Sequence, residues 1–269
     1  MLSDVPGSDF PVYISTGYFR LTDNRFFVPL SVVVPGSQIP FTRSSDQDRA
    51  TLDVIAVIRD EQRRPFGNLR ETFKVETSAS ESVQRKNVQY DSGFLLPPGR
   101  YSLKVVVREN QTGRIGSFEA GLEIPDLKNA PVKMSSVVVS NQKQPARQRT
   151  NNPLVRDGQQ IVPNVTHVFS SGQNLHFYYE VYDAGRGDTS SRTSVRVLSS
   201  VAFYKGNIKA YETPLVRAEE VNVPDRKATA FEFQVPLAQL KPGFYTCQIN
   251  VVDDAAGKFV FPRLALLVR

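Results

Sequence analysis

The chain has 269 residues, of which 40% are hydrophobic and 22% charged, and this composition excludes wholesale disorder, coiled coil and collagen. The formal net charge is +6, and the single cysteine excludes an internal disulfide and any multi-cysteine metal site. No apolar run approaches the roughly 20 residues that a membrane-spanning helix needs. At roughly 100–200 residues per domain, the length predicts one or two domains.

The first nine residues are polar and have neither the basic cluster nor the apolar core of a signal peptide. Two interpretations fit this start. The chain is either a cytosolic protein or an excised piece of a longer exported chain, with Met1 added or fortuitous. The abrupt change from a disordered Pro/Gly lead to strand-like sequence favours the excised piece.

Short segments of alternating hydrophobicity, separated by turn residues, predict seven β-strands in the first half. Their number is typical of a small β-sandwich. The segments are 12–20, 26–34, 51–59, 69–77, 86–95, 101–108 and 115–124.

The strongest internal signal is a repeat. The segment Leu96–Val107 resembles Leu240–Val251 at a constant offset of 144 residues, and the turns that follow match as well. A repeat of this period indicates two copies of one domain, since solenoids repeat every 20–50 residues.

Each copy carries the pattern Leu-x-Pro-Gly-x-Tyr. Proline fixes φ and glycine permits unusual backbone angles, so the pair makes a sharp corner into the next strand. We expect Tyr101 and Tyr245 to bury their rings over this corner and to bond nearby backbone, as in the tyrosine corner of Greek-key sandwiches. The predicted fold is all-β, with two tandem Greek-key β-sandwiches of the immunoglobulin or fibronectin-III type.

The second half predicts nine further strands, and no sustained helical spacing is found in it. The prolines of 125–131 mark the expected junction, which divides the chain into domains 1–127 and 128–269. The strands are 135–140, 165–169, 174–182, 194–204, 206–212, 219–223, 228–235, 244–252 and 258–268.

Charge is divided unevenly between these halves. Residues 1–127 carry 15 basic and 16 acidic side chains, whereas residues 128–269 carry 18 and 11. Residues 141–156 contain no acid and predict a basic loop formed by Lys143, Arg147, Arg149 and Arg156. Such a loop suits phosphate or an anionic envelope polymer, or is simply solvated; it has no aromatic residue, so specific nucleic-acid binding is not expected.

Three segments together resemble a known family. They are 19–41, then Leu52–Asp60 followed by Arg64-Pro65, and Leu95–Tyr101. They are similar to the C-terminal β-rich region of acidobacterial VWFA-related domain proteins, in which an exported chain carries a von Willebrand factor A-like domain before β-rich segments. The resemblance covers residues 12–268 and implies an extracellular or cell-envelope location, including the periplasm, with an adhesive or scaffolding role. The metal motif of the A domain, Asp-x-Ser-x-Ser, is absent, so no metal site is carried over.

One strand has a polar row that suits a binding face. Alternation places His176, Tyr178, Glu180 and Tyr182 on the same side of strand 174–182. Such a row either binds a ligand or forms a solvated or inter-domain face. Two histidines without a third ligand do not specify zinc.

Other candidate groups have structural explanations. Cys247 takes the place of Leu103 in the repeat and is expected in the core. Asp253-Asp254 matches the turn at Glu109, which favours a turn rather than an acid–base pair. Arg186-Gly187-Asp188 matches an integrin-type adhesion tripeptide, a match so short that it arises easily by chance. The nucleophile, zinc-protease and nucleotide-binding motifs are missing, and we expect no catalytic residue and no cofactor.

Three functions therefore compete. The leading one is a non-catalytic structural or interaction region that spaces or presents another domain, with a protein or an envelope polymer as partner. The first alternative is a carbohydrate or anionic-polymer binding module, for which Tyr178 and Tyr182 are the aromatic candidates. The second is an enzyme, such as a hydrolase with catalytic residues on loops. The oligomeric state is left open.

Overall fold

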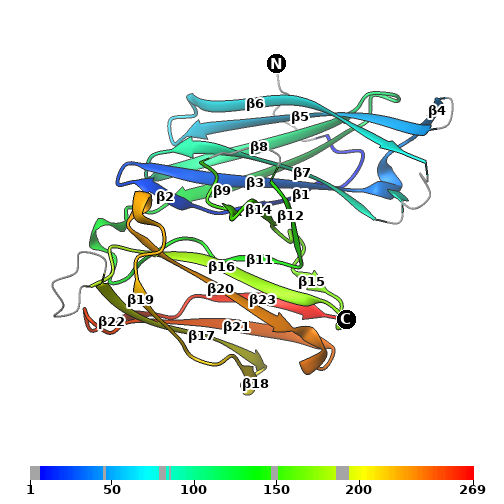
Figure 1. Ribbon diagram of the computed structural model, residues 1–269. Helices are drawn as coiled ribbons and strands as arrows, with labels where there is room; N and C mark the ends of the chain where they lie inside the picture. The colour runs from blue at the N-terminus through cyan, green and yellow to red at the C-terminus, as the bar shows by residue number, and fades with distance from the viewer. Residues whose placement is uncertain (1–6, 45–46, 79–82, 85, 147–150, 186–193) are drawn as a thin grey trace. The chain divides into compact units, whose positions relative to one another are not determined.

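The computed structural model describes residues 7–44, 47–78, 83–84, 86–146, 151–185 and 194–269 (Figure 1). Strands dominate these residues, and their helical structure is limited to four short 3-10 turns and residues 83–84. The predicted all-β fold class is confirmed. Within the described ranges, no helix has the length and apolar character to cross a membrane.

The chain forms two compact units whose boundaries are not a single cut. Unit 1 consists of residues 1–16 and 29–125, and unit 2 of residues 17–28 and 126–269. The expected division between 127 and 128 differs from this in one important respect. Residues 17–28 belong to the second unit, so the chain passes between the units at 16/17, 28/29 and 125/126.

Unit 1 contains the long strands at the blue-to-green end of Figure 1. Strand β3 (Arg25–Pro35) pairs with β1 (Tyr13–Thr16) through its later residues and with β7 (Asn87–Leu96). The second sheet has the order β4-β5-β8-β9, with β6 also paired to β5. Its strands are β4 (Thr42–Ser44), β5 (Gln47–Asp60), β6 (Pro65–Thr77), β8 (Gly99–Glu109) and β9 (Ile115–Ile124), and the 3-10 turn η1 spans Gly36–Gln38.

Alternation along the paired strands β5 and β8 builds the core of unit 1. Their register places Val54 opposite Val107 and Ile58 opposite Leu103, and all four side chains are almost fully buried. The intervening residues of β5 are only partly buried. Each fully buried aliphatic side chain contributes roughly 1.5–3 kcal/mol, so this row is a main source of the unit's stability.

Unit 2 has two main sheets and one small one. The first joins β10 (Lys133–Met134), β16 (Asn174–Tyr182), β11 (Val138–Ser140) and β20 (Ala228–Pro236). The second has the order β15-β23-β21-β17-β18, with β19 on β17 and β22 on β21. Its strands are β15 (Val168–Phe169), β17 (Ser194–Lys205), β18 (Ile208–Glu212), β19 (Val216–Glu220), β21 (Gly243–Asp253), β22 (Lys258–Val260) and β23 (Arg263–Val268).

The core of unit 2 lies between these two sheets. Phe177 of β16 meets Phe203 of β17 edge-on, with ring centroids 5.8 Å apart, and both rings are fully buried. Cys247 lies in the same cluster, fully buried, which confirms its expected core position. Unit 2 also contains three 3-10 turns, which are η2 (Leu127–Asn129), η3 (Pro224–Arg226) and η4 (Leu237–Gln239).

The small sheet corrects the predicted basic loop. Strands β12 (Gln142–Pro145), β13 (Val155–Arg156) and β14 (Gln159–Val162) pair as β12-β14-β13 within and beside the 141–156 segment. These strands are only two to four residues long and rich in glutamine, so the alternation that predicts longer strands has too few residues to show.

The two tyrosine corners are confirmed. The Tyr101 hydroxyl donates to the Pro97 carbonyl oxygen at 3.1 Å, and the Tyr245 hydroxyl donates to that of Lys241 at 2.6 Å. Both tyrosines are buried. Gly99 and Gly243 precede them with φ of 156° and 147°, which a residue with a Cβ adopts only under strain.

Candidate functional site

The segment 17–28 is a hairpin held in unit 2 by both backbone and side chains. Strand β2 (Phe19–Thr22) pairs with the first residues of β3, and the two strands turn at Asp23-Asn24. The Ser136 amide donates to the Tyr18 carbonyl oxygen at 3.0 Å, and the Tyr18 amide donates to the Ser136 side-chain hydroxyl at 3.0 Å. Phe19 is fully buried and stacks on Tyr178, with ring centroids 5.8 Å apart.

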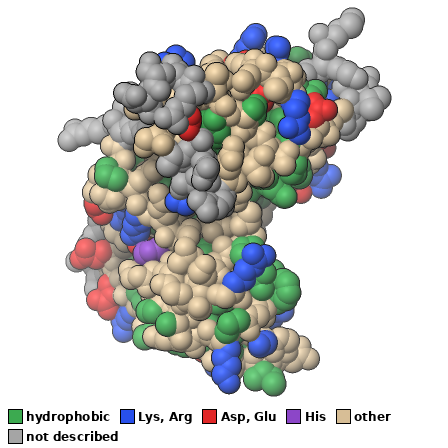
Figure 2. Space-filling model, turned by 90° about the vertical axis from the view of Figure 1, so that its right-hand side faces the viewer, with side chains coloured by type: hydrophobic (Ala, Val, Ile, Leu, Met, Phe, Trp, Pro, Cys, Tyr) green, Lys and Arg blue, Asp and Glu red, His purple; other side chains and the backbone are tan. Residues whose placement is uncertain are grey.

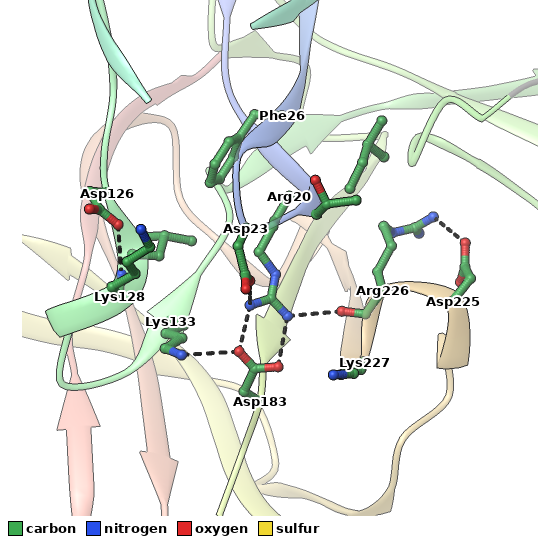
Figure 3. Close-up of a pocket in the computed structure, with 13 residues that line it drawn as sticks. Arg20, Asp23, Phe26, Asp126, Lys128, Lys133, Asp183, Asp225, Arg226 and Lys227 are labelled. Carbon is green, nitrogen blue, oxygen red and sulfur yellow. Dashed lines mark hydrogen bonds and ion pairs between the residues drawn. The ribbon is translucent and has the colours of Figure 1, made fainter. Parts of the chain in front are cut away.

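Arg20 anchors the hairpin next to this aromatic contact. Its guanidinium group donates to both carboxylate oxygens of Asp183, at 2.5 and 2.9 Å, and to the Arg226 carbonyl oxygen at 3.0 Å (Figure 3). Its backbone amide donates to the Tyr182 hydroxyl at 2.9 Å, and its guanidinium carbon lies 4.6 Å from the centre of that ring. Two parallel N–H···O bonds give this Arg–Asp pair both strength and a fixed geometry.

Asp183 lies just beyond β16 with a positive φ of 47°. Its carboxylate also accepts from Lys133 at 3.1 Å, and its amide donates to the Lys227 carbonyl oxygen at 3.1 Å. Hydrogen bonds from Arg20, aided by Lys133, lower the pKa of Asp183 to about 2. A carboxylate of such low pKa is a poor base near neutral pH, because it holds a proton too weakly.

A second, deeper ion pair lies on the same side of β16. Glu180 is fully buried, and Arg226 donates to its two oxygens at 2.6 and 3.1 Å. The Tyr178 hydroxyl donates to the same carboxylate at 2.7 Å. Burial, followed by the nearby Glu180 charge, raises the pKa of Tyr178, so this hydroxyl stays a neutral donor. Removing one partner of such a pair leaves the other as an uncompensated buried charge.

Arg20, Lys133, Asp183 and Arg226 border a cavity of about 470 Å³ in unit 2. Its lining includes five basic and four acidic side chains, most of which interact with one another (Figure 3). Lys128 and Lys227 are exposed at its edge. The arrangement fixes the hairpin onto β16, because Arg20 of the hairpin binds Asp183 just beyond that strand. Arg226, which also borders the cavity, binds Glu180 within the strand.

The predicted polar row on β16 exists, but it is not an open binding face. Tyr178, Glu180 and Tyr182 are all at most 1% exposed, because the hairpin and η3 cover them. The expectation that Tyr178 and Tyr182 present aromatic surface to a carbohydrate is therefore wrong. Strand alternation identified their common side correctly, but it gave no sign that a segment more than 150 residues earlier covers that side.

His176, the fourth member of the row, is separate from the network. Its Nδ1 atom is buried without a hydrogen-bond partner and lies 3.8 Å from a carboxylate oxygen of Glu232. Burial, followed by the nearby Lys143 charge, lowers the pKa of His176. The ring is therefore neutral at neutral pH and forms no true ion pair with Glu232.

The expected basic patch is only partly described, since Arg147 and Arg149 lie outside the described residues. Of the other two members, Lys143 forms an ion pair with Glu232. The guanidinium carbon of Arg156 lies 5.9 Å from the centre of the Tyr178 ring. Lys and Arg side chains are spread over the face in Figure 2 rather than gathered in one place.

The remaining candidates behave as structural groups. Asp253 accepts from the amides of Ala256 and Gly185, at 3.1 and 2.7 Å, which confirms the turn interpretation. Burial raises the pKa of the Cys247 thiol, so it is a poor nucleophile. The Arg186-Gly187-Asp188 tripeptide lies outside the described residues. Within the described ranges, no three His, Cys, Asp or Glu side chains gather as a metal site.

The residues that organise this region, Arg20, Asp183 and Arg226, were not among the candidates predicted from the sequence. A usable signal was present, because Glu180 lies in a strand whose neighbours are almost all apolar or aromatic. A charge in such a strand requires a basic partner if it is buried. The sequence did not show which of the many arginines would supply it.

Comparisons with solved structures find distant likenesses. No family model matches the chain, and no curated protein matches its sequence. The structure is similar to part of a trypsin-activated alpha-2-macroglobulin from Escherichia coli, with 11% identity and a TM-score of 0.27, covering 98% of this chain and 17% of that one. It is also similar to part of a glycosyl hydrolase family 2 member from Bacteroides cellulosilyticus, with 11% identity and a TM-score of 0.28, covering 91% and 29%. The chain thus spans less than a third of either protein, and scores this low assign it no function.

Proposed function

We propose that this chain is a non-catalytic structural and interaction region of an exported bacterial protein, where it presents or spaces a von Willebrand A-like domain. The observation that supports it most is the use of the reactive side chains in unit 2. Glu180 and Asp183 are bound by arginines, Asp253 holds two backbone amides, and Cys247 is packed in the core. Groups with these partners stabilise a scaffold and are poorly placed to exchange protons with a substrate.

The path of the chain also supports a spacer. Because residues 17–28 belong to unit 2, the two units are linked by chain passages at three places rather than by one linker. The hydrogen bonds of Arg20 to Asp183 and to the Arg226 carbonyl oxygen hold residues 17–28 in unit 2. The three passages support the spacer role of the two units, and the resemblance to VWFA-related proteins implies the neighbouring A-like domain.

The proposal can be tested by locating the native protein. An antibody raised against residues 126–269 would be applied to cytosolic, envelope and medium fractions of the source cells. We expect a band well above 30.1 kDa in the envelope or medium, with tryptic peptides of an A-like domain preceding this region. A cytosolic band of 30.1 kDa would contradict it.

A binding module for a polymer is the second candidate, and unit 2 offers one observation in its favour. Two phenylalanines of this unit, Phe259 and Phe261, are 60% and 44% exposed. Exposed aromatic side chains outside a core are typical of binding surfaces. They replace Tyr178 and Tyr182 as candidates for this function.

A further inference from the structure

The outer face of the larger sheet in unit 2 carries a polar row that crosses four strands. Residues Cys247, Ile249 and Val251 of β21 are fully buried, so the alternate residues Gln248 and Asn250 lie on the side away from the core. Arg263 of β23 lies opposite Gln248 in the register of the sheet. On the other side, Ser200 of β17 lies opposite Asn250.

Hydrogen bonds fix the orientation of these side chains. The Arg263 Nε donates to the Gln248 side-chain oxygen at 2.8 Å, and the Gln248 amide nitrogen donates to the Asn250 side-chain oxygen at 2.8 Å. The Asn250 amide nitrogen donates to Ser200 at 3.0 Å and to Glu212 of β18 at 3.3 Å. The two amides are therefore held in one orientation by partners on both sides.

An aromatic pair adjoins this row. Strands β22 and β23 share one register against β21, in which Val251 faces Val260 and Gln248 faces Arg263, so Phe261 lies opposite Asn250. Phe259 lies opposite Val252, on the same side. The two rings stack with centroids 5.2 Å apart and an interplanar angle of 23°.

We propose that this outer face, formed by Phe259, Phe261, Asn250, Gln248 and Arg263, binds a neutral polysaccharide. Sugar hydroxyls both donate and accept hydrogen bonds, which matches side-chain amides and a guanidinium group. The C–H groups on the faces of a pyranose ring carry partial positive charge and suit the negative face of an aromatic ring. Amides that are already fixed lose little conformational entropy on binding.

The composition of the face favours a sugar over other partners. A protein interface has an apolar centre with a polar rim, whereas here the partly exposed side chains of the central strand β21 are Gln248 and Asn250, with Ser200 buried beside them at 3% exposure. Glu212 and Lys209, at the end of the row, bond to each other at 2.8 Å and largely cancel in charge. Arg263 is then the charged member of the proposed face, and its Nε is bonded to the neutral side chain of Gln248. The other four members are uncharged, so we take a neutral polymer as the occupant and an acidic one as the alternative that the test examines.

The test is native affinity electrophoresis of the whole chain in gels that contain hydroxyethyl cellulose, xylan, mannan or dextran, with alginate as the acidic polymer. We expect retardation by at least one neutral polymer. The double variant Phe259→Ala/Phe261→Ala and the variant Asn250→Ala should each weaken binding about tenfold or more, as the loss of a central contact does.

A control variant removes a still more exposed ring, 75% accessible, elsewhere on the same side of the sheet. Phe244→Ala acts at the far end of β21 and should leave binding unchanged. Absence of retardation in all neutral gels, retardation by alginate alone, or equal affinity of the aromatic double variant and the unmodified chain would overturn the proposal. In each variant, protection of the buried Cys247 thiol from a thiol reagent in buffer without urea would show that unit 2 is folded. The inference is independent of cellular location, so fractionation and electrophoresis can fail separately.

Discussion

The two copies of the repeat show what a shared sequence pattern determines and what it leaves open. In both, a Pro-Gly corner is followed by a buried tyrosine whose hydroxyl donates to the carbonyl four residues earlier. The turns that follow differ. Glu109 accepts from the amides of Gln111 and Thr112 in its own turn, at 2.5 and 2.7 Å, whereas Asp253 also accepts from Gly185 in another loop. The repeat thus fixes the corner, while residues outside it decide what each turn holds.

In unit 2, the hairpin formed by residues 17–28 covers the polar row of β16, and this feature lies outside the repeated pattern. No position in the repeat accounts for Arg20, Glu180 or Arg226. We therefore expect the stability of unit 2 to depend on the ion pairs Arg20–Asp183 and Glu180–Arg226, and the removal of one partner should lower it.

The largest effect is expected from Arg226→Met. It leaves Glu180 buried and charged without its partner, which costs about 3–5 kcal/mol in the free energy of unfolding. Cys247 is the single cysteine of the chain and lies in the core of unit 2, so its labelling by a thiol reagent in urea reports on this unit. The double variant Glu180→Gln/Arg226→Met is the control and should recover much of the loss. A change below about 1 kcal/mol in the single variant would show that the pair is dispensable.

The corners should respond next. Tyr245→Phe and Tyr101→Phe each remove one hydroxyl and leave a carbonyl without its donor, at about 1–2 kcal/mol. We expect the larger loss at Tyr245, because it is more buried and its bond is shorter. Urea unfolding followed by hydrogen exchange of each unit would measure both, and unchanged stability of both variants would contradict the corner assignment.

The turns at Asp253 and Glu109 should differ in how far the effect of a substitution spreads. Asp253→Asn keeps one acceptor oxygen but weakens the pair of amide bonds, at about 1 kcal/mol. Hydrogen exchange should rise at Gly185 as well as at Ala256. In the matched variant Glu109→Gln, the rise should stay within residues 109–114. An equal local response in both variants would mean that Asp253 does not hold the second loop.

Much of the fold was predictable because it follows from local periodicity. The buried residues of β5 and β8, the core position of Cys247 and both corners follow from alternation and from the repeat. The short strands β12, β13 and β14 were missed because strands of two to four residues leave too little alternation to detect.

The charge cluster was not predictable in the same way. Alternation places Tyr178, Glu180 and Tyr182 on one side of β16, and that was correct. Whether that side faces solvent depends on Phe19 and Arg20, which are more than 150 residues away in the sequence. The predicted boundary at 127/128 placed residues 17–28 in the first domain for the same reason. No local sequence pattern shows that a hairpin belongs to the unit formed by residues much later in the chain.

The smallest effect on the free energy of unfolding is expected from Asp183→Asn, and it should depend on pH. The folded-state pKa of Asp183 is lowered to about 2 by Arg20 and Lys133, whereas its value in the unfolded chain is about 3.9. A lowered pKa stabilises the folded state above the unfolded value, and that contribution is lost as the pH falls from about 4 to about 2. Only modest stability is at stake, because the Asp183 side chain is 30% exposed. Asp183→Asn should therefore be less stable than the unmodified chain in urea at about pH 6 and nearly equal to it at about pH 2. A difference between the two chains that stays constant across this range would show that the Arg20–Asp183 bonds do not depend on the carboxylate charge.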